Sequence, residues 1–341
     1  SAMPSAEARR LCPQAIWTHG HFDRYREVSA QVMAILAEET PRVERVSIDE
    51  AFIDITPGRF APEDPLQVAR RISDRVAALG VTCSIGVGCN KTVAKIASER
   101  DKPFGLTIVR PGTEQRFLAA LPVSAMSGIG RSAEERLRRM RIYTLGELSR
   151  APESTLASIF GVNGERMRQR ALGLEISEVT SLDEEREVKS VSNERTFAKD
   201  LTERGDIEAA IALLGESVGR RLRRQGLTGA TVTLKLKYSY GSGRSAQRRL
   251  PHPTDDENIF VAVALELLDN IWQEGMHVRL AGIGMSDFDH QGGIQTDLFC
   301  EVDDRGAQSS DRRDLSVAID AVRDKFGDTA LSFGRQSRFN D

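Results

Sequence analysis

The sequence predicts a multidomain α/β and α+β protein with a small all-α region in between. Its length of 341 residues exceeds what one ordinary hydrophobic core can hold, so two to four domains are expected. The pattern of the chain changes after Pro122, where alternating strands and helices give way to short basic helices. Beyond residue 188, a strand–helix–strand order occurs twice, which predicts a βαββαβ domain.

The first region has apolar residues at alternating strand and helix spacings. These spacings predict helices over 23–38 and 65–79 and strands within 42–56 and 81–88. Asn90 can cap a further helix, whose buried side would contain Val93, Ile96 and Ala97. Such alternation predicts a sheet with helices packed against it.

The later regions are predicted from the same spacings. Two short helical units with glycine turns follow Pro122, and an acidic segment separates them from the βαββαβ region. The elements expected there are strands 189–197, 230–239, 244–250 and 278–288 and helices 205–225 and 256–274. The last fifty residues are polar and rich in aspartate, with one helix expected at 311–326, and are predicted to form a loosely attached tail.

Composition narrows the class of protein. No apolar run reaches the roughly 20 residues of a membrane span, and the N-terminal residues do not resemble a signal peptide. The four scattered cysteines favour a reduced, cytoplasmic protein without a disulfide framework or zinc site. The net charge is −3, but residues 189–250 contain 13 Lys and Arg against 6 Asp and Glu. Several basic blocks in one chain indicate a polyanionic partner.

Two adjacent carboxylates, Asp49 and Glu50, interrupt the apolar run "RVERVSIDEAFIDIT". In a regular strand they would point to opposite faces, but at the tip of a tight hairpin both can reach one site. Paired carboxylates are suited to Mg²⁺, and two such ions can drive in-line phosphoryl transfer. A solvent-exposed acidic turn is the alternative for this dipeptide alone.

Three motifs in a fixed order reduce that ambiguity. "SIDEAF", then "SIGVGCNKTVAKIASERDKPFG", then "SGIG" resemble the Y-family DNA polymerases, and most closely their bacterial DNA polymerase IV branch. The resemblance implies an error-prone, translesion-type DNA polymerase with two Mg²⁺ ions. Asp49 would be a metal ligand, Glu50 would complete the site and help to activate the primer 3′-hydroxyl, and Lys102 would bind the triphosphate of the incoming dNTP.

The resemblance also implies a segment that this sequence does not contain. Family members have an earlier palm strand with a third metal-binding aspartate, followed by fingers residues that hold the triphosphate. Here "SAMPSAEARRLCP", which lies downstream of that strand in the family, is the N-terminus. We therefore expect a truncated palm and fingers. A non-catalytic remnant that binds DNA and the sliding clamp remains the alternative to an active polymerase.

The resemblance assigns further residues to DNA. The basic helical segment is similar to a helix-hairpin-helix thumb, and the βαββαβ region to the little finger of this family. The implied DNA-binding residues are Gly128, Gly130 and Arg131 in the thumb and Arg195, Thr196, Lys235 and Lys237 in the little finger. Lys235 and Lys237 would share one face of a strand while Leu234 and Leu236 face the helices.

The tail contains a short apolar pair in polar surroundings. The pentapeptide "QTDLF" is similar to the sliding-clamp-binding motif of bacterial polymerases, with Gln295, Leu298 and Phe299 as anchors. The expected protein is a monomer that binds primer-template DNA, dNTPs and the clamp. The expected domains are a fingers remnant (1–22), palm (23–112), thumb (113–176), linker (177–188), little finger (189–289) and tail (290–341).

Overall fold

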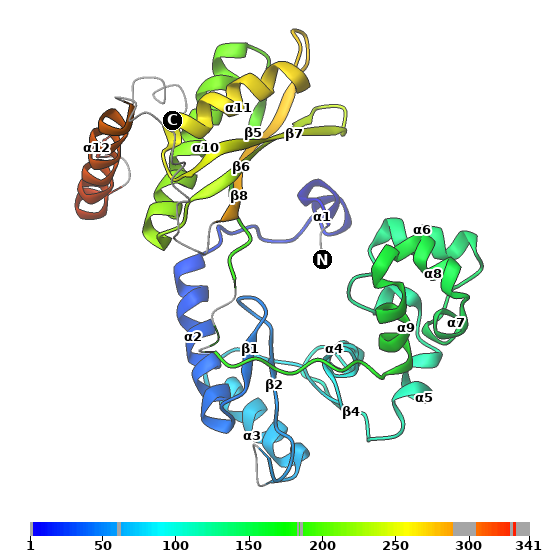
Figure 1. Cartoon of the computed structure of the whole chain (residues 1–341). Coiled ribbons are helices and arrows are strands. Elements are labelled where there is room, and N and C mark those ends of the chain that lie inside the picture. Colours follow the sequence, from blue (N-terminus) through cyan, green and yellow to red (C-terminus); the bar gives the residue numbers. More distant parts are fainter. Residues whose placement is uncertain are drawn as a thin grey trace, which may run out of the picture. The chain divides into compact units, whose positions relative to one another are not determined.

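The computed structural model describes residues 3–59, 63–182, 184, 187–288, 305–327 and 330–331. The chain divides into two compact units, Ser1–Glu185 and Arg186–Asp341 (Figure 1). The division falls within the acidic segment that the sequence suggests as a linker. None of the described helices is both long and apolar enough to cross a lipid bilayer.

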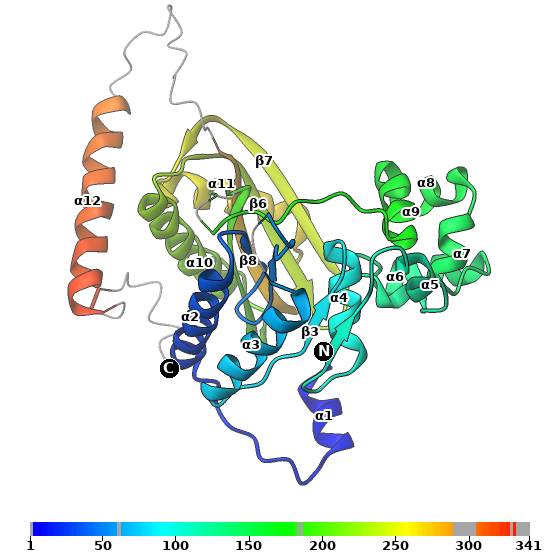
Figure 2. The same cartoon turned by 90° about the horizontal axis from the view of Figure 1, so that it is seen from below.

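The first unit begins with a short helix, α1 (Ser5–Leu11), and then a hairpin packed on two helices. Strands β1 (Val43–Arg45) and β2 (Ala51–Ile53) pair antiparallel. Helices α2 (Phe22–Glu39) and α3 (Pro65–Ala78) lie side by side, as Figure 2 shows. Their core consists of Ile35, Val68, Ile72 and Val76. The expected helices are thus confirmed, and the acidic dipeptide lies between the strands of a hairpin.

A second small sheet follows in the same unit. Strands β3 (Ile85–Val87) and β4 (Leu106–Ile108) are parallel and are joined by helix α4 (Lys91–Arg100). The Asn90 side chain accepts a hydrogen bond from the Val93 amide, and Val93 is fully buried, so the expected cap is confirmed. Gly86 allows α4 to approach the strand, because a Cβ there would lie 2.0 Å from the Ala94 carbonyl oxygen.

The remainder of the first unit is a cluster of short helices. These are α5 (Glu114–Ala119), α6 (Arg131–Arg139), α7 (Leu145–Arg150), α8 (Glu153–Phe160) and α9 (Gly164–Leu172), with 3₁₀ turns at Val123–Ala125 and Gly161–Asn163. Their buried leucines belong to the same core as Val93 and Ile96 of α4. The helical cluster is therefore packed directly onto the helix that follows β3.

The second unit has the predicted βαββαβ order. Its elements are β5 (Ser190–Leu201), α10 (Arg204–Gln225), β6 (Gly229–Tyr238), β7 (Gly243–Thr254), α11 (Glu257–Ile271) and β8 (Val278–Phe288). The strands form one antiparallel sheet in the order β5-β8-β6-β7, and both helices cover the same face (Figures 1 and 2). Leu234 and Leu236 are buried beneath the helices, as expected.

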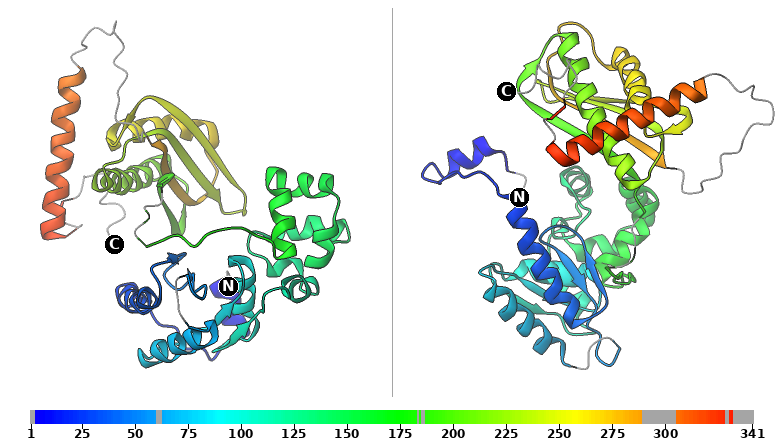
Figure 3. Two further views of the ribbon diagram at one scale, coloured as in Figure 1. Left: turned by 60° about the horizontal axis from the view of Figure 1, so that its bottom comes forward. Right: turned by 90° about the vertical axis from the view of Figure 1, so that its left-hand side faces the viewer.

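The described part of the tail differs from the loosely attached segment that its polarity suggests. Helix α12 (Arg305–Phe326) crosses α10 and is joined to it by ion pairs (Figure 3). Arg223 of α10 contacts Asp320 at 2.7 Å and Glu257 at 2.5 Å, and Arg323 contacts Glu216. The expectation was wrong because polar residues were taken as solvated, although their partners lie about a hundred residues earlier in the chain.

Candidate active site and nucleic-acid interface

The acidic dipeptide lies at the tip of the β1–β2 hairpin. The Val46 and Ser47 amides both donate to the Glu50 carbonyl oxygen, at 2.9 and 3.1 Å, and close the turn. The Ser47 hydroxyl lies 2.5 Å from the Asp49 carboxylate, and the Ser29 hydroxyl of α2 donates to the Ile48 carbonyl oxygen. These bonds hold Asp49 and Glu50 in an ordered turn between β1 and β2.

A row of alternating charges begins at this tip and continues along α4. The Lys95 ammonium lies 2.6 Å from the Glu50 carboxylate and 2.9 Å from that of Glu99. Lys102, just past the end of α4, lies 2.8 Å from Glu99. The structure thus links the proposed metal ligand Glu50 to the proposed triphosphate ligand Lys102 through two residues that the motif comparison did not assign.

The pKa directions in this row follow from these contacts. Partial burial lowers the pKa of Lys95, but its hydrogen bonds to Glu50 and Glu99 outweigh burial, so the net shift is upward. The pKa of Glu99 is lowered, first by the hydrogen bond from Lys102 and then by that from Lys95. Lys95 and Glu99 are therefore charged at neutral pH, and ion pairs hold the row together.

The residues at the tip suit a hard divalent cation in their chemistry. Asp49 and Glu50 offer carboxylate oxygens, which are the ligands that Mg²⁺ prefers, and the Glu50 side chain remains 44% exposed. Within the described residues, no group of three or more His, Cys, Asp or Glu side chains could hold a metal ion. The metal-binding role of Asp49 and Glu50 therefore stays a prediction from the sequence.

The glycine turn before α6 is open at the N-terminus of the helix. Gly128 has φ of +95°, a conformation that favours glycine, and Gly130 is the N-cap residue without a side-chain hydrogen bond. Arg131 begins the helix with an exposed side chain, 3.3 Å from Glu135. Unsatisfied backbone N–H groups at a helix N-terminus favour an anion such as a phosphate.

A polar cluster fixes the helical region against α4. The Thr92 hydroxyl bonds to Glu175 at 2.5 Å and accepts from Arg170 at 2.8 Å. The Asn90 side-chain amide donates to the Gly173 carbonyl oxygen at 2.7 Å. Because these contacts join α4 to α9 and the residues after it, the helical region and the charged row share one rigid support.

The second unit has one sheet face that no described helix covers. Strand register places Thr196 opposite Leu280, and Lys235 and Lys237 opposite Gly282 and Leu280. Thr196, Lys235 and Lys237 therefore share this open face. Arg195 is opposite buried Ala281 and has its guanidinium over the Phe197 ring, so it points to the helix-covered side. Of Arg195 and Thr196, which the sequence predicts to bind DNA, only Thr196 lies on the open face, because neighbouring side chains in a strand alternate.

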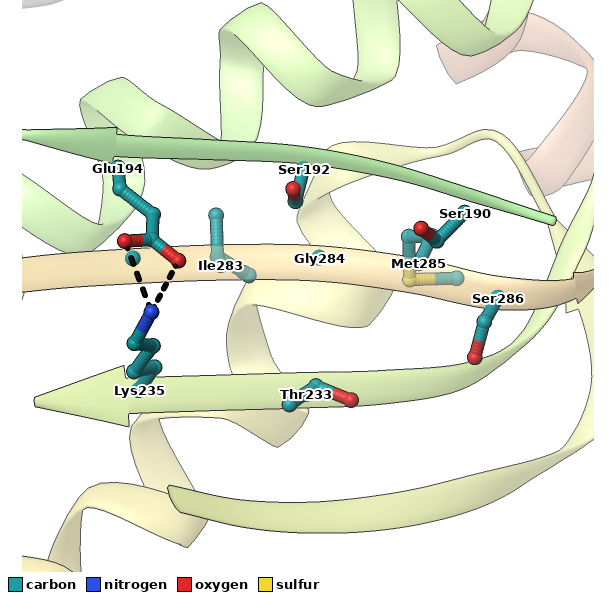
Figure 4. Close-up of a pocket in the computed structure, with 10 residues that line it drawn as sticks. Ser190, Ser192, Glu194, Thr233, Lys235, Ile283, Gly284, Met285 and Ser286 are labelled. Carbon is teal, nitrogen blue, oxygen red and sulfur yellow. Dashed lines mark hydrogen bonds and ion pairs between the residues drawn. The ribbon is translucent and has the colours of Figure 1, made fainter. Parts of the chain in front are cut away.

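A shallow groove runs along the open face at its central strand (Figure 4). Gly282 and Gly284 of β8 form its floor, and Lys235 reaches across to Glu194 at 2.7 Å. A Cβ on Gly282 would lie 2.6 Å from the Glu194 side chain, so the glycine makes room for this ion pair. Gly284 is half-buried, and a glycine in a strand allows another chain to approach its backbone closely.

The site residues differ in how far the structure describes them. Glu50 and Lys102 are connected through Lys95 and Glu99, whereas Asp49 bonds to Ser47. Gly128, Gly130 and Arg131 lie at the start of one helix. The proposed clamp-binding residues Gln295, Leu298 and Phe299 lie outside the described residues. The sequence does contain a signal for Lys95 and Glu99. With Lys102 they occupy positions i, i+4 and i+7, a spacing that places all three on one side of a helix.

Comparisons with known proteins agree with this architecture. Residues 1–99 match the impB/mucB/samB family model, and residues 188–298 match the model of the impB/mucB/samB family C-terminal domain. DNA polymerase IV of Lactococcus lactis subsp. cremoris (strain MG1363) is 37% identical over 290 residues, covering 84% of this chain and 79% of the relative. DNA polymerase IV of Dehalococcoides mccartyi (strain BAV1) is 34% identical over 343 residues, covering 100% of this chain and 85% of the relative.

Solved structures share the fold. A Y-family DNA polymerase chimera of Dbh and Dpo4 is 23% identical and superposes with a TM-score of 0.72, covering 84% of this chain and 82% of that one. An insertion ternary complex of Dbh DNA polymerase gives a TM-score of 0.52 over 84% of this chain and 83% of that one. The fold is that of the Y-family polymerases. The chain belongs to the impB/mucB/samB family, which confirms the resemblance found in its motifs.

Proposed function

We propose that this chain is a DNA-directed DNA polymerase of the error-prone, translesion type. The main observation is the ordered hairpin tip that carries Asp49 and Glu50, where Glu50 contacts Lys95 of α4 at 2.6 Å. Family membership supports the proposal, because the curated relatives are DNA polymerases IV. The substrates would be primer-template DNA and dNTPs.

In the proposed reaction, the primer 3′-oxygen attacks the α-phosphorus of the dNTP. A new P–O bond forms, the hydroxyl proton is released, and pyrophosphate leaves. Two Mg²⁺ ions, when bound, would neutralise phosphate charge and lower the pKa of the attacking hydroxyl. Asp49 and Glu50 would hold these ions, with Glu50 also helping to activate the 3′-hydroxyl. Lys102 would bind the triphosphate as a point charge, which suits a lysine.

DNA would be held by contacts to its backbone, which do not read sequence. The open N-terminus of α6, with Gly128, Gly130 and Arg131, offers N–H groups and a positive charge to a phosphate. Thr196, Lys235 and Lys237 would contact the duplex from the open face of the sheet. Gln295, Leu298 and Phe299 would tether a monomeric, cytoplasmic enzyme to the sliding clamp and so raise its effective concentration on DNA.

Primer extension by the 341-residue chain tests this proposal. With Mg²⁺ and all four dNTPs, we expect extension that is lost in Asp49→Asn and in Glu50→Ala, while primer-template binding is retained. Asp23→Asn is the matched control, because it removes an exposed carboxylate of the same unit that pairs with Arg26. Undiminished extension by the Asp49→Asn variant would exclude the metal-ligand assignment.

A second candidate is a non-catalytic module that binds DNA and the clamp. It is favoured by one observation, since the described residues contain no group of three potential metal ligands. This candidate predicts primer-template binding without extension by the chain. The same experiment therefore separates the two functions.

A further inference from the structure

Four charged side chains, from Glu50 at one end to Lys102 at the other, form a continuous series in which each contacts the next. The contacts are Glu50 to Lys95 at 2.6 Å, Lys95 to Glu99 at 2.9 Å, and Glu99 to Lys102 at 2.8 Å. The two ends are groups assigned above to the metal and the triphosphate. The two middle residues, Lys95 and Glu99, have no assigned role.

Each pair in the series can exchange its partner. The side chains of Glu50, Lys95, Glu99 and Lys102 are 44%, 29%, 45% and 53% exposed. Exposed ion pairs are individually weak, so an incoming ion of higher charge displaces one partner at low cost. A divalent cation at Glu50 competes with the Lys95 ammonium for the same carboxylate. A triphosphate at Lys102 likewise competes with Glu99.

The two displacements assist each other. When a triphosphate binds Lys102, the Lys102–Glu99 ion pair breaks. The Glu99 carboxylate then has Lys95 as its only partner, so Lys95 shifts from Glu50 toward Glu99. Glu50 is then available to a metal ion. By linkage, a metal ion at Glu50 releases Lys95 and makes the Lys102 end more receptive to the triphosphate to the same extent.

We propose that Lys95 and Glu99 are positioning residues that couple the two ends of this series, with Lys95 acting as the built-in counter-cation of Glu50 until metal and nucleotide arrive. This inference rests on the proposed function, because it takes Glu50 as a metal ligand. It also implies that the nucleotide-free protein binds divalent metal weakly.

Metal binding to the nucleotide-free 341-residue chain tests the proposal without any measurement of activity. Free Mn²⁺ is titrated by electron paramagnetic resonance at constant ionic strength. In Lys95→Met the competitor is removed, and we expect Mn²⁺ to bind about three- to five-fold more tightly. In Glu99→Gln, Lys95 keeps Glu50 as its only partner, and we expect binding about two-fold weaker.

Lys91→Met is the matched control. It removes the same charge one helical turn earlier on α4, but Lys91 contacts Glu44 and not Glu50. Thermal unfolding of each variant verifies that α4 remains folded. We expect Lys91→Met to change Mn²⁺ affinity by less than the Lys95 variant does.

The double variant Asp49→Asn/Glu50→Gln separates the possible failures. If it binds Mn²⁺ as the unaltered chain does, no metal is held at the hairpin tip, and both the proposed function and this inference are overturned. If it loses Mn²⁺ binding but Lys95→Met matches Lys91→Met, the metal site stands and the coupling is overturned. Opposite shifts in the Lys95 and Glu99 variants are the result expected from the series.

Discussion

In the second unit, strand register decides which basic side chains lie on the open face of the sheet, where a polyanion could contact them. Lys235 and Lys237 are two positions apart in β6 and share the open face. Arg195 is adjacent to Thr196 in sequence but lies on the side of the helices. Net charge counted along the sequence therefore overestimates the charge available to a polyanion on the open face.

This difference can be measured as the salt dependence of DNA binding. Replacing Lys237 with Gln removes one phosphate contact on the open face, and we expect the slope of log K against log salt to fall in magnitude by about 0.9. Arg195→Gln is the control and should change the slope less, because its guanidinium lies over Phe197. Fluorescence anisotropy of a labelled primer-template at several salt concentrations gives both slopes. Equal slopes in the two variants would exclude the proposed face.

At the scale of elements, one buried carboxylate joins helices α2 and α3. Arg71 of α3 bonds to both oxygens of Glu39, at 3.0 and 2.6 Å, and the Glu39 side chain is almost fully buried. The hydrogen bonds from Arg71 lower the pKa of Glu39. A carboxyl group whose folded-state pKa is depressed stabilises the fold above its unfolded pKa and loses that effect as pH falls through the folded value.

The consequence is an acid-dependent stability of the first unit. We expect Glu39→Gln to lower its stability at pH 7 by on the order of 1 kcal/mol, a fall in Tm of about 2–4 °C. The variant and the unaltered chain should converge as pH falls below 4.5 and then through the lower folded-state pKa of Glu39, where the carboxyl group becomes protonated. Glu63→Gln removes the more exposed partner of Arg71 and should have a smaller effect. A pH-independent difference between the Glu39 variant and the unaltered chain would contradict this account.

Elements with a clear period could be predicted from the sequence, whereas contacts between distant elements could not. Helix α10 and strand β6 follow apolar spacings of 3.6 and 2, and both lie close to their predicted limits. The hairpin around Asp49 and Glu50 was expected from its chemistry. The Lys95–Glu50 pair spans 45 residues and the Arg223–Asp320 pair 97 residues, and no local pattern encodes such pairings.

At the scale of the whole molecule, the two compact units have separate hydrophobic cores. Leu234 is fully buried in the core of the second unit, and Leu145 in that of the helical region of the first. Neither core contains residues of the other unit. The units should therefore unfold as separate cooperative blocks.

Calorimetry of paired variants tests this independence. A buried Leu→Ala change costs about 2–5 kcal/mol, which shifts a transition of this size by roughly 5–15 °C. We expect Leu234→Ala to lower one thermal transition and Leu145→Ala to lower the other. A single transition that moves in both variants would show that the units unfold together.

Helix α12 places two carboxylates against a group of arginines on α10. Asp320 and Asp324 pair with Arg220, Arg223 and Arg224 of α10. Among the residues that the structure describes, Lys237 has no ion pair, and it lies on the opposite side of the layer, on the open sheet. A dipolar body in the field of a polyanion turns its positive pole toward it before contact. Asp320 and Asp324 offset part of the arginine charge on α10, and this local asymmetry would help to turn the open sheet toward a polyanion during encounter.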